Sequence, residues 1–180
     1  MRRIRFSLAT LLVLTVAVAF ALTAILLIWP TPRNRVTQMF GGRSGVKTVS
    51  QPDKVYAFRL GPLPESLFYD DASASDFPIA SGPKEVGRTG VKAASAALLS
   101  PDSYEWEWAK ACAFTPDGKL TFVRESDRVD VIFAFDCDVL RIYRNDELTG
   151  GEDFDKASPT FSRIFAECFP DDAGPTRIGQ

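Results

Sequence analysis

An uncharged run of residues between Phe6 and Pro32 places the strongest constraint on how this chain can fold. Within this run, Leu8–Trp29 comprises 22 residues of Leu, Val, Ala, Ile, Thr, Phe and Trp. As a helix the segment would be about 33 Å long, enough to cross a hydrocarbon core of about 30 Å. The pattern therefore predicts an N-terminal transmembrane helix, a single-pass signal-anchor whose partner is the lipid bilayer.

A cleaved signal peptide is the alternative, with Ala19-Phe20-Ala21 as its small-x-small cleavage site. The apolar run continues past that site to Trp29, which favours a retained anchor. The short tail ahead of the run carries Arg2, Arg3 and Arg5, and moving these charges outward opposes the membrane potential. We expect a cell-membrane protein with a cytoplasmic N-terminus and an extracytoplasmic domain.

Composition changes along the chain predict its organisation. The segment that follows the apolar run is rich in Pro, Gly and Arg and is typical of a linker. What remains is the size of one ordinary domain. The predicted parts are a cytoplasmic tail over 1–7, a transmembrane helix over 8–29, a linker over 30–50, an α+β domain over 51–172 and a flexible tail over 173–180.

The charge balance argues against nucleic-acid binding. From Gly45 onward the chain has 15 basic and 23 acidic residues, a net charge of −8, whereas a nucleic-acid footprint is basic. The sequence contains no histidine, the commonest general base and a frequent zinc ligand. Phosphate-binding, nucleophile-elbow and C-x-x-C motifs are also missing from the sequence. We therefore assign no catalytic residue, no metal ligand and no cofactor.

Alternating hydrophobicity predicts four strands, and helical periodicity predicts two helices. The order β-α-β-β-β-α indicates an α+β fold, a two-layer domain with an antiparallel sheet of about four strands and two helices. A long loop is expected over 64–83. The predicted strands cover 54–60, 119–124, 128–135 and 139–143, and the predicted helices cover 84–99 and 158–168.

Three cysteines leave either one disulfide and a free thiol or no disulfide. Cys112 and Cys137 flank two predicted strands, and a bridge between them would close a loop of about 25 residues. Cys168 shares the apolar stripe of the last helix with Phe161, Ile164 and Phe165, where a thiol behaves as a small apolar group. Cys112–Cys137 is thus the candidate disulfide.

Two further clusters have both a functional and a structural interpretation. The acidic cluster could support metal-assisted or acid/base chemistry, or its members could cap turns and helix starts. Tyr104, Trp106 and Trp108 alternate with Glu105 and Glu107, so the three aromatic rings would share one face of an extended segment. They could form a recognition surface or pack in the core. The acidic cluster consists of Asp136, Asp138, Glu152, Asp153 and Asp155.

Several short motifs resemble those of a known but uncharacterised group of proteins. They are PDSYEW from Pro101, KAC from Lys110, RVDV from Arg128, FDCD from Phe135, GGEDFD from Gly150 and FPDD from Phe169. With these motifs, the stretch from Lys54 to Asp172 resembles an uncharacterised bacterial family of small membrane-anchored or exported domains. The resemblance implies no activity and assigns no site residue.

Together these observations predict a membrane-tethered, non-enzymatic binding domain of the bacterial cell envelope, whose partner is an unknown envelope protein. Tyr104, Trp106 and Trp108 are its candidate binding residues. The alternatives are a metal-assisted or carboxylate-based hydrolytic enzyme and a purely structural envelope protein. The missing catalytic motifs favour the binding domain over the enzyme.

Overall fold

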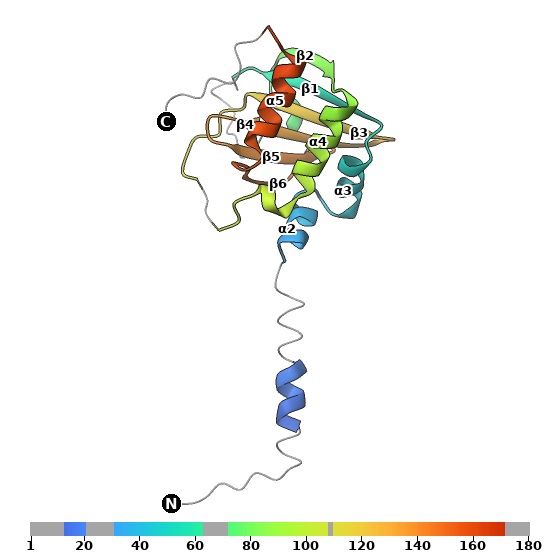
Figure 1. Ribbon diagram of the computed structural model, residues 1–180, viewed down its shortest axis with the longest axis vertical. Coiled ribbons are helices and arrows are strands. Elements are labelled where there is room, and N and C mark those ends of the chain that lie inside the picture. Colours follow the sequence, from blue (N-terminus) through green and yellow to red (C-terminus); the bar gives the residue numbers. More distant parts are fainter. Residues whose placement is uncertain (1–12, 21–30, 63–71, 108–109, 172–180) are drawn as a thin grey trace, which may run out of the picture. The chain divides into compact units, whose positions relative to one another are not determined.

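The computed structural model of the chain describes residues 13–20, 31–62, 72–107 and 110–171 (Figure 1). The chain divides into two compact units, Met1–Thr31 and Pro32–Gln180. In the first unit, residues 13–20 are helical and their side chains are exposed. The second unit is an α+β domain, as the sequence predicts.

The prediction of a transmembrane helix over Leu8–Trp29 is wrong for the residues that the structure describes. Residues 13–20 of the expected span are helical, and eight helical residues extend over about 12 Å, whereas a bilayer core requires roughly 30 Å. Across the described parts of the chain, none of the helices is both long and apolar enough to cross a membrane. Residues 8–12 and 21–29 of the expected span lie outside the described residues. The predictions of a signal-anchor and of a single-pass cell-membrane protein depend on that transmembrane helix and are therefore wrong as well.

The second unit is built on a six-stranded, fully antiparallel sheet, two strands more than predicted. The strand order across the sheet is β2-β1-β3-β4-β5-β6. From β3 to β6, neighbouring strands are consecutive along the chain, and β1 lies between β2 and β3. The strands are β1 Lys54–Leu60, β2 Ile79–Glu85, β3 Gly118–Arg124, β4 Asp127–Ala134, β5 Val139–Arg144 and β6 Glu147–Asp153.

Tight turns set the register of the second half of the sheet. Arg124 pairs with Asp127 across a two-residue turn, and Arg144 pairs with Glu147 across another. Asn145 and Asp146, the two residues of the β5–β6 turn, both have positive φ angles, 49° and 78°. Two successive positive φ values characterise the turn whose twist matches a hairpin, and Asn and Asp tolerate them better than most residues.

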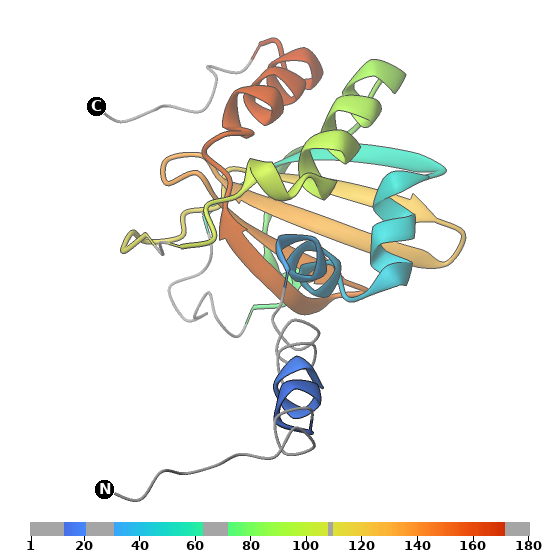
Figure 2. The same ribbon diagram turned by 60° about the horizontal axis from the view of Figure 1, so that its bottom comes forward.

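The α-helices of this unit cover one face of the sheet (Figures 1 and 2). Alternate residues of β3 and β4, including Leu120, Phe122 and Val131, are buried in the core cluster that the helices cap. Phe133 lies at its centre, with its ring 4.7 Å from Phe161 and 5.7 Å from Phe165 between ring centroids. The helices are α2 Pro32–Met39, α3 Arg43–Ser50, α4 Arg88–Leu99 and α5 Ser158–Cys168.

The opposite face of the sheet has a second, smaller core. Ile132, Ala134 and Tyr143 pack there with Phe77, which follows a 3-10 turn over Ala74–Asp76. Ser75 donates its backbone N–H and its hydroxyl to the Asp146 carboxylate at 2.8 and 2.7 Å, which fastens the 3-10 turn to the β5–β6 hairpin. The middle of the sheet is therefore buried on both faces.

The segment over 30–50, predicted as a linker, forms α2 and α3 and belongs to the folded unit. Val36 and Phe40 are 3% and 0% exposed, and Val49 is fully buried. Of the residues that suggested a linker, Pro32 and Arg43 begin these short helices, whereas Gly45 is buried within α3. The domain therefore begins at Pro32 rather than at residue 51. The predicted tails over 1–7 and 173–180 lie outside the described residues.

Asp127, at the start of β4, fastens α3 to the sheet. One of its carboxylate oxygens accepts hydrogen bonds from Ser44 at 3.0 Å and Thr48 at 2.7 Å, both on α3. The other accepts from Arg144 Nε and the Asn145 side chain, each at 3.1 Å. Partial burial raises the pKa of Asp127, but these four hydrogen bonds lower it by more, so the net pKa falls below its ordinary value.

Candidate functional site

The predicted aromatic face is mainly a packing element. Tyr104 is 2% exposed, and its hydroxyl donates to the Leu98 carbonyl oxygen at 2.6 Å. Trp106 is half-buried against the core, with its ring centroid 5.1 Å from that of Tyr104. Its indole N–H donates to the Pro101 carbonyl oxygen at 2.8 Å, and the Arg35 guanidinium lies 5.7 Å from its ring centroid. Trp108 lies outside the described residues.

The five acidic residues of the predicted cluster do not converge on one point. Asp136 is exposed in the β4–β5 turn, and Asp138 is half-buried in the same turn. Asp155 forms an ion pair with Lys110 at 2.6 Å. Within the ranges that the structure describes, no three acidic or cysteine side chains lie close enough together to hold a metal ion.

Glu152 and Asp153 line a shallow pocket of about 300 Å³ at the β5–β6 end of the sheet. Its remaining walls include Lys110, Phe114 and Arg141, whose guanidinium lies 4.6 Å from the Phe114 ring centroid. Burial raises the pKa of Glu152 and of Asp153, and for Asp153 the neighbouring Asp155 and Glu105 raise it further. The pocket therefore contains two carboxylates, Glu152 and Asp153, and two cations, Lys110 and Arg141.

The structure joins Cys112 and Cys137 in a disulfide, with their Cα atoms 6.4 Å apart. The bridge ties the irregular segment ahead of β3 to the β4–β5 turn. Lys110 strengthens the same junction, because its ammonium group donates to the Cys137 carbonyl oxygen at 2.8 Å. Cys168 is a free thiol, half-buried on α5, and burial raises its pKa.

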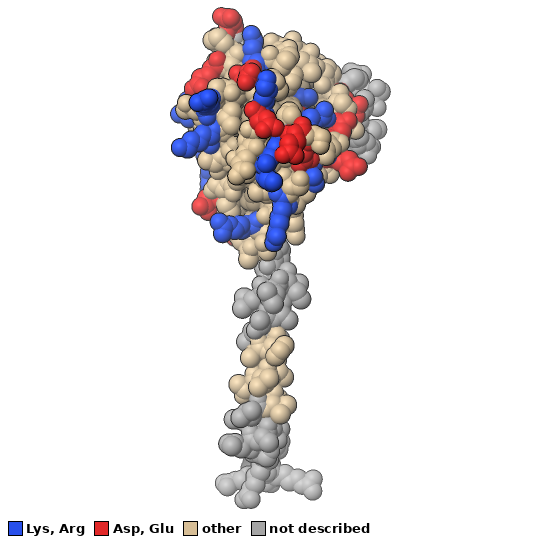
Figure 3. Space-filling view, turned by 90° about the vertical axis from the view of Figure 1, so that its right-hand side faces the viewer, with Lys and Arg blue, Asp and Glu red and all other residues tan. Residues whose placement is uncertain are grey.

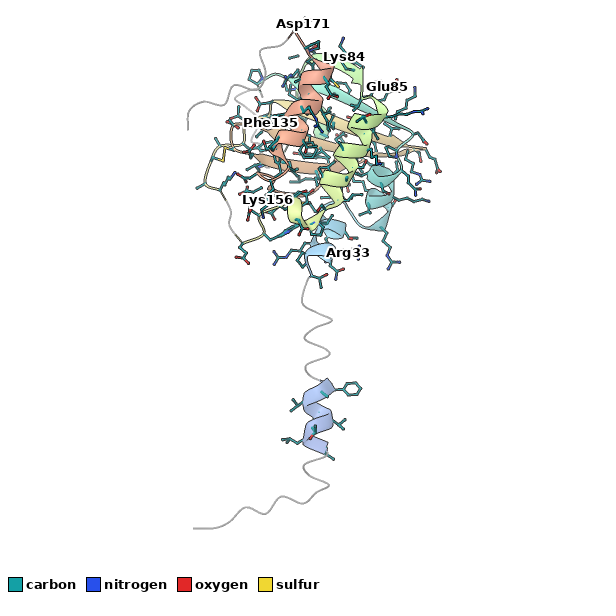
Figure 4. The ribbon with its side chains drawn as sticks, viewed as in Figure 1. Arg33, Lys84, Glu85, Phe135, Lys156 and Asp171 are labelled. Carbon is teal, nitrogen blue, oxygen red and sulfur yellow. A yellow bond between two sulfur atoms is a disulfide. The ribbon has the colours of Figure 1, made fainter. Side chains whose placement is uncertain are left out.

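A larger depression lies on the other side of the domain, where α3 ends and α4 begins. This α3–α4 groove has a volume of about 610 Å³, within the 300–1,000 Å³ typical of ligand pockets. Val55, Val86 and Val91 form its apolar floor, and Ser95 ties the two helices together by donating to the Val49 carbonyl oxygen at 2.6 Å. Figure 4 places Glu85, at the end of β2, near this part of the domain and far from Lys156.

The rim of the α3–α4 groove carries charges that have no ion-pair partner among the described residues. Lys54, Arg88 and Lys92 supply three positive charges, and Glu85 supplies a negative charge. Over the described part of the chain, none of these four side chains takes part in an ion pair or side-chain hydrogen bond. Asp53 also lines the groove, but its carboxylate accepts the Glu125 backbone N–H at 2.7 Å. Figure 3 shows basic and acidic side chains interspersed over the face that it presents.

Comparison of the chain with protein-family models, with curated proteins and with solved structures finds no match.

None of the rim residues was singled out by the sequence. Lys54 began a predicted strand, and Arg88 and Lys92 fell within the predicted helix over 84–99 without a role of their own. One signal was available: Arg88 and Lys92 are four residues apart at the beginning of α4, and the first turn of that helix contains no acidic residue. Like charges at this spacing destabilise a helix, as do cations near its positive end.

Proposed function

We propose that this domain is a non-enzymatic binding module that holds a ligand in the α3–α4 groove. The observation that carries the proposal is a set of charges with no ion-pair partner among the described residues, Lys54, Glu85, Arg88 and Lys92, around an apolar floor in a pocket of about 610 Å³. Charged side chains on an ordinary surface are solvated and interspersed, whereas a pocket that combines apolar area with a few polar groups is typical of ligand sites.

The acidic residues at the opposite end of the sheet favour binding over catalysis as the function. A carboxylate that acts as a general acid or base must reach its substrate within hydrogen-bonding distance. Asp155 is held by Lys110 at 2.6 Å, and Glu105 is held by Lys156 at 2.7 Å. The pocket that Glu152 and Asp153 line is about half the volume of the α3–α4 groove.

Fragment binding to the full-length, ¹⁵N-labelled protein tests the proposal. We expect members of a library of small neutral and charged compounds to shift the amide resonances of Val55, Val86 and Val91. Lys92→Trp places an indole over the groove and should abolish these shifts. Ala96→Trp is the matched control, because Ala96 is equally exposed on α4 but lies outside the groove, and it should preserve them.

Two results would contradict the proposal. Fragment-induced shifts that cluster elsewhere, or that survive Lys92→Trp, would remove the groove as the binding site. Recovery of a bound compound in chemically altered form would show catalysis instead of binding, and mass spectrometry of the compounds after incubation detects it.

A further inference from the structure

The beginning of α4 breaks two rules of helix stability, and it does so beside the α3–α4 groove. Arg88 is the first residue of the helix and Lys92 lies one turn later, so both cations are near the positive end of the helix dipole. Their spacing of four residues also brings like charges together on one side of the helix. The cap residue Gly87 provides no side-chain hydrogen bond, and the first turn lacks an acidic residue.

These unfavourable features are local and are not compensated within the described residues. Arg88 and Lys92 are exposed and form no ion pair there, and the nearest lining acid on the chain, Glu85, precedes the helix. Violations of local stability rules that lack an internal compensation are expected at functional sites. A bound anion would offset both unfavourable effects, the repulsion between the two cations and their repulsion by the positive end of the helix dipole.

We propose that the groove binds the oxyanion of a small amphiphilic ligand, a carboxylate or a phosphate ester. This proposal rests on the proposed function. The anion lies between Arg88, Lys92 and Lys54, and the apolar part of the ligand lies on the floor formed by Val55, Val86 and Val91. Glu85 disfavours a second negative charge at its end of the groove and so favours a ligand whose charge is at one end.

Three probes with the same hexyl chain and different head-group charges distinguish the electrostatic from the apolar contribution to affinity. Hexanoate, hexanol and hexylammonium are titrated into the full-length protein, with the amide resonances of Val86, Gly87 and Val91 as the readout. We expect hexanoate to bind about fivefold more tightly than hexanol, because ion pairs with exposed cations are weak, and hexylammonium to bind most weakly. Added salt should weaken hexanoate binding and leave hexanol binding unchanged.

Charge-removing variants test the named residues. Arg88→Gln with Lys92→Gln should reduce hexanoate affinity to that of hexanol and leave hexanol affinity unaltered. Arg43→Gln is the matched control, because Arg43 is an exposed cation at the far end of α3 and does not line the groove. Without ligand, the double variant should be at least as stable as the natural protein in thermal unfolding, since it removes a like-charge repulsion.

The outcomes distinguish the two proposals. Equal affinities for hexanoate and hexanol, or hexanoate binding that the double variant does not change, would overturn anion recognition and leave a binding groove. Failure of all three probes to shift the groove resonances would overturn both. A double variant that is less stable than the natural protein would show that Arg88 and Lys92 have a structural role instead.

Discussion

At the scale of single residues, Asp127 is the most connected polar side chain that joins a helix to the sheet. It accepts hydrogen bonds from Ser44, Thr48, Arg144 and Asn145, so one carboxylate at the start of β4 joins α3 to the end of β5 and the β5–β6 turn. Hydrogen bonds to a charged group each stabilise by about 1.5–3 kcal/mol.

Asp127→Asn should lower the free energy of unfolding by about 1–2 kcal/mol, because the amide group has one acceptor oxygen where the carboxylate has two. Chemical denaturation at neutral pH measures the change. Glu125→Gln is the control, because the neighbouring Glu125 side chain is 81% exposed and its loss should cost almost nothing. Equal effects of the two substitutions would show that the carboxylate is not a structural hub.

The same residue predicts a pH dependence. The folded pKa of Asp127 is lowered, so the unfolded chain takes up its proton first as the pH falls. The stabilisation is complete above the ordinary aspartate pKa of about 3.9 and is lost as the pH falls through the lower folded value. The free energy of unfolding, measured by chemical denaturation at several pH values between 6 and 2, should therefore fall less steeply for Asp127→Asn than for the natural protein. An equal fall in the free energy of unfolding with pH for both proteins would contradict the hydrogen-bond explanation.

At the scale of secondary-structure elements, Gly118 allows α5 to approach the sheet closely. A Cβ atom at this position, the first of β3, would lie 2.5 Å from Cε1 and 2.6 Å from Cζ of Phe165. Phe165 is fully buried among other aromatic rings and cannot move without disturbing them. The glycine is needed here for space and not for its backbone conformation.

Gly118→Ala should therefore destabilise the domain by about 1–3 kcal/mol through overpacking. Gly61→Ala is the matched control, because the nearest atom to a Cβ there is 3.7 Å away. Thermal unfolding of both variants measures the difference. Combining Gly118→Ala with Phe165→Leu should restore part of the loss, and a double variant less stable than the sum of the single changes would contradict this packing argument.

The disulfide acts at the same scale, because it joins the segment ahead of β3 to the β4–β5 turn. Its residues are 25 positions apart, and a bridge of that span stabilises by about 3 kcal/mol in the chain-entropy model. Non-reducing peptide mapping of the full-length protein should find Cys112 linked to Cys137 and Cys168 free. Cys112→Ser with Cys137→Ser should unfold at lower denaturant concentration. A bridge that involves Cys168 would contradict the structure.

Which elements the sequence predicts depends on how their residues are buried. β1 matches its predicted range, and β3, β4 and β5 differ by one residue at their ends, because the core faces of these strands alternate regularly. β2 was missed since all seven of its residues are exposed and Gly82-Pro83 suggests a turn. β6 was missed because Gly150 and Gly151 interrupt it. Gly150 leaves room for Met39, since a Cβ atom at this position would lie 2.7 Å from the Met39 Cγ atom.

The candidate site was less predictable than the fold. A groove is made by segments that are distant along the chain, here the end of α3 and the beginnings of β1 and α4, and no periodicity within one segment reveals it. The aromatic residues stood out because of their size, yet Tyr104 proved to be buried. The disulfide partners could be named as a pair only because they flank adjacent strands.

At the scale of the whole molecule, the folded unit begins earlier than residue 51. α2, α3 and the turn between them contribute Val36, Met39, Phe40 and Val49 to the core, and these side chains are 0–6% exposed. Removing them would uncover part of the helix-facing side of the sheet. Burial of each large apolar side chain contributes about 1.5–3 kcal/mol, so the four together are comparable to the net stability of a domain.

Two fragments test this boundary. Residues 32–180 should unfold cooperatively and give dispersed amide resonances, since the contacts of α2 and α3 are retained. Residues 51–180 should unfold at a much lower temperature or remain unfolded. Circular dichroism melts and NMR spectra of both fragments provide the measurement. Equal stability of the two fragments would show that α2 and α3 are accessory to the fold.

Each edge of the sheet carries a feature that opposes pairing with a strand of another copy. Pro83 has no amide hydrogen to offer an incoming strand, and the pairing of β2 is irregular along its length. At the other edge, the Asp153 carbonyl oxygen of β6 already accepts the Glu105 backbone N–H at 3.2 Å. Addition of a further strand is thus opposed at the β2 edge by a missing donor and at the β6 edge by an occupied acceptor.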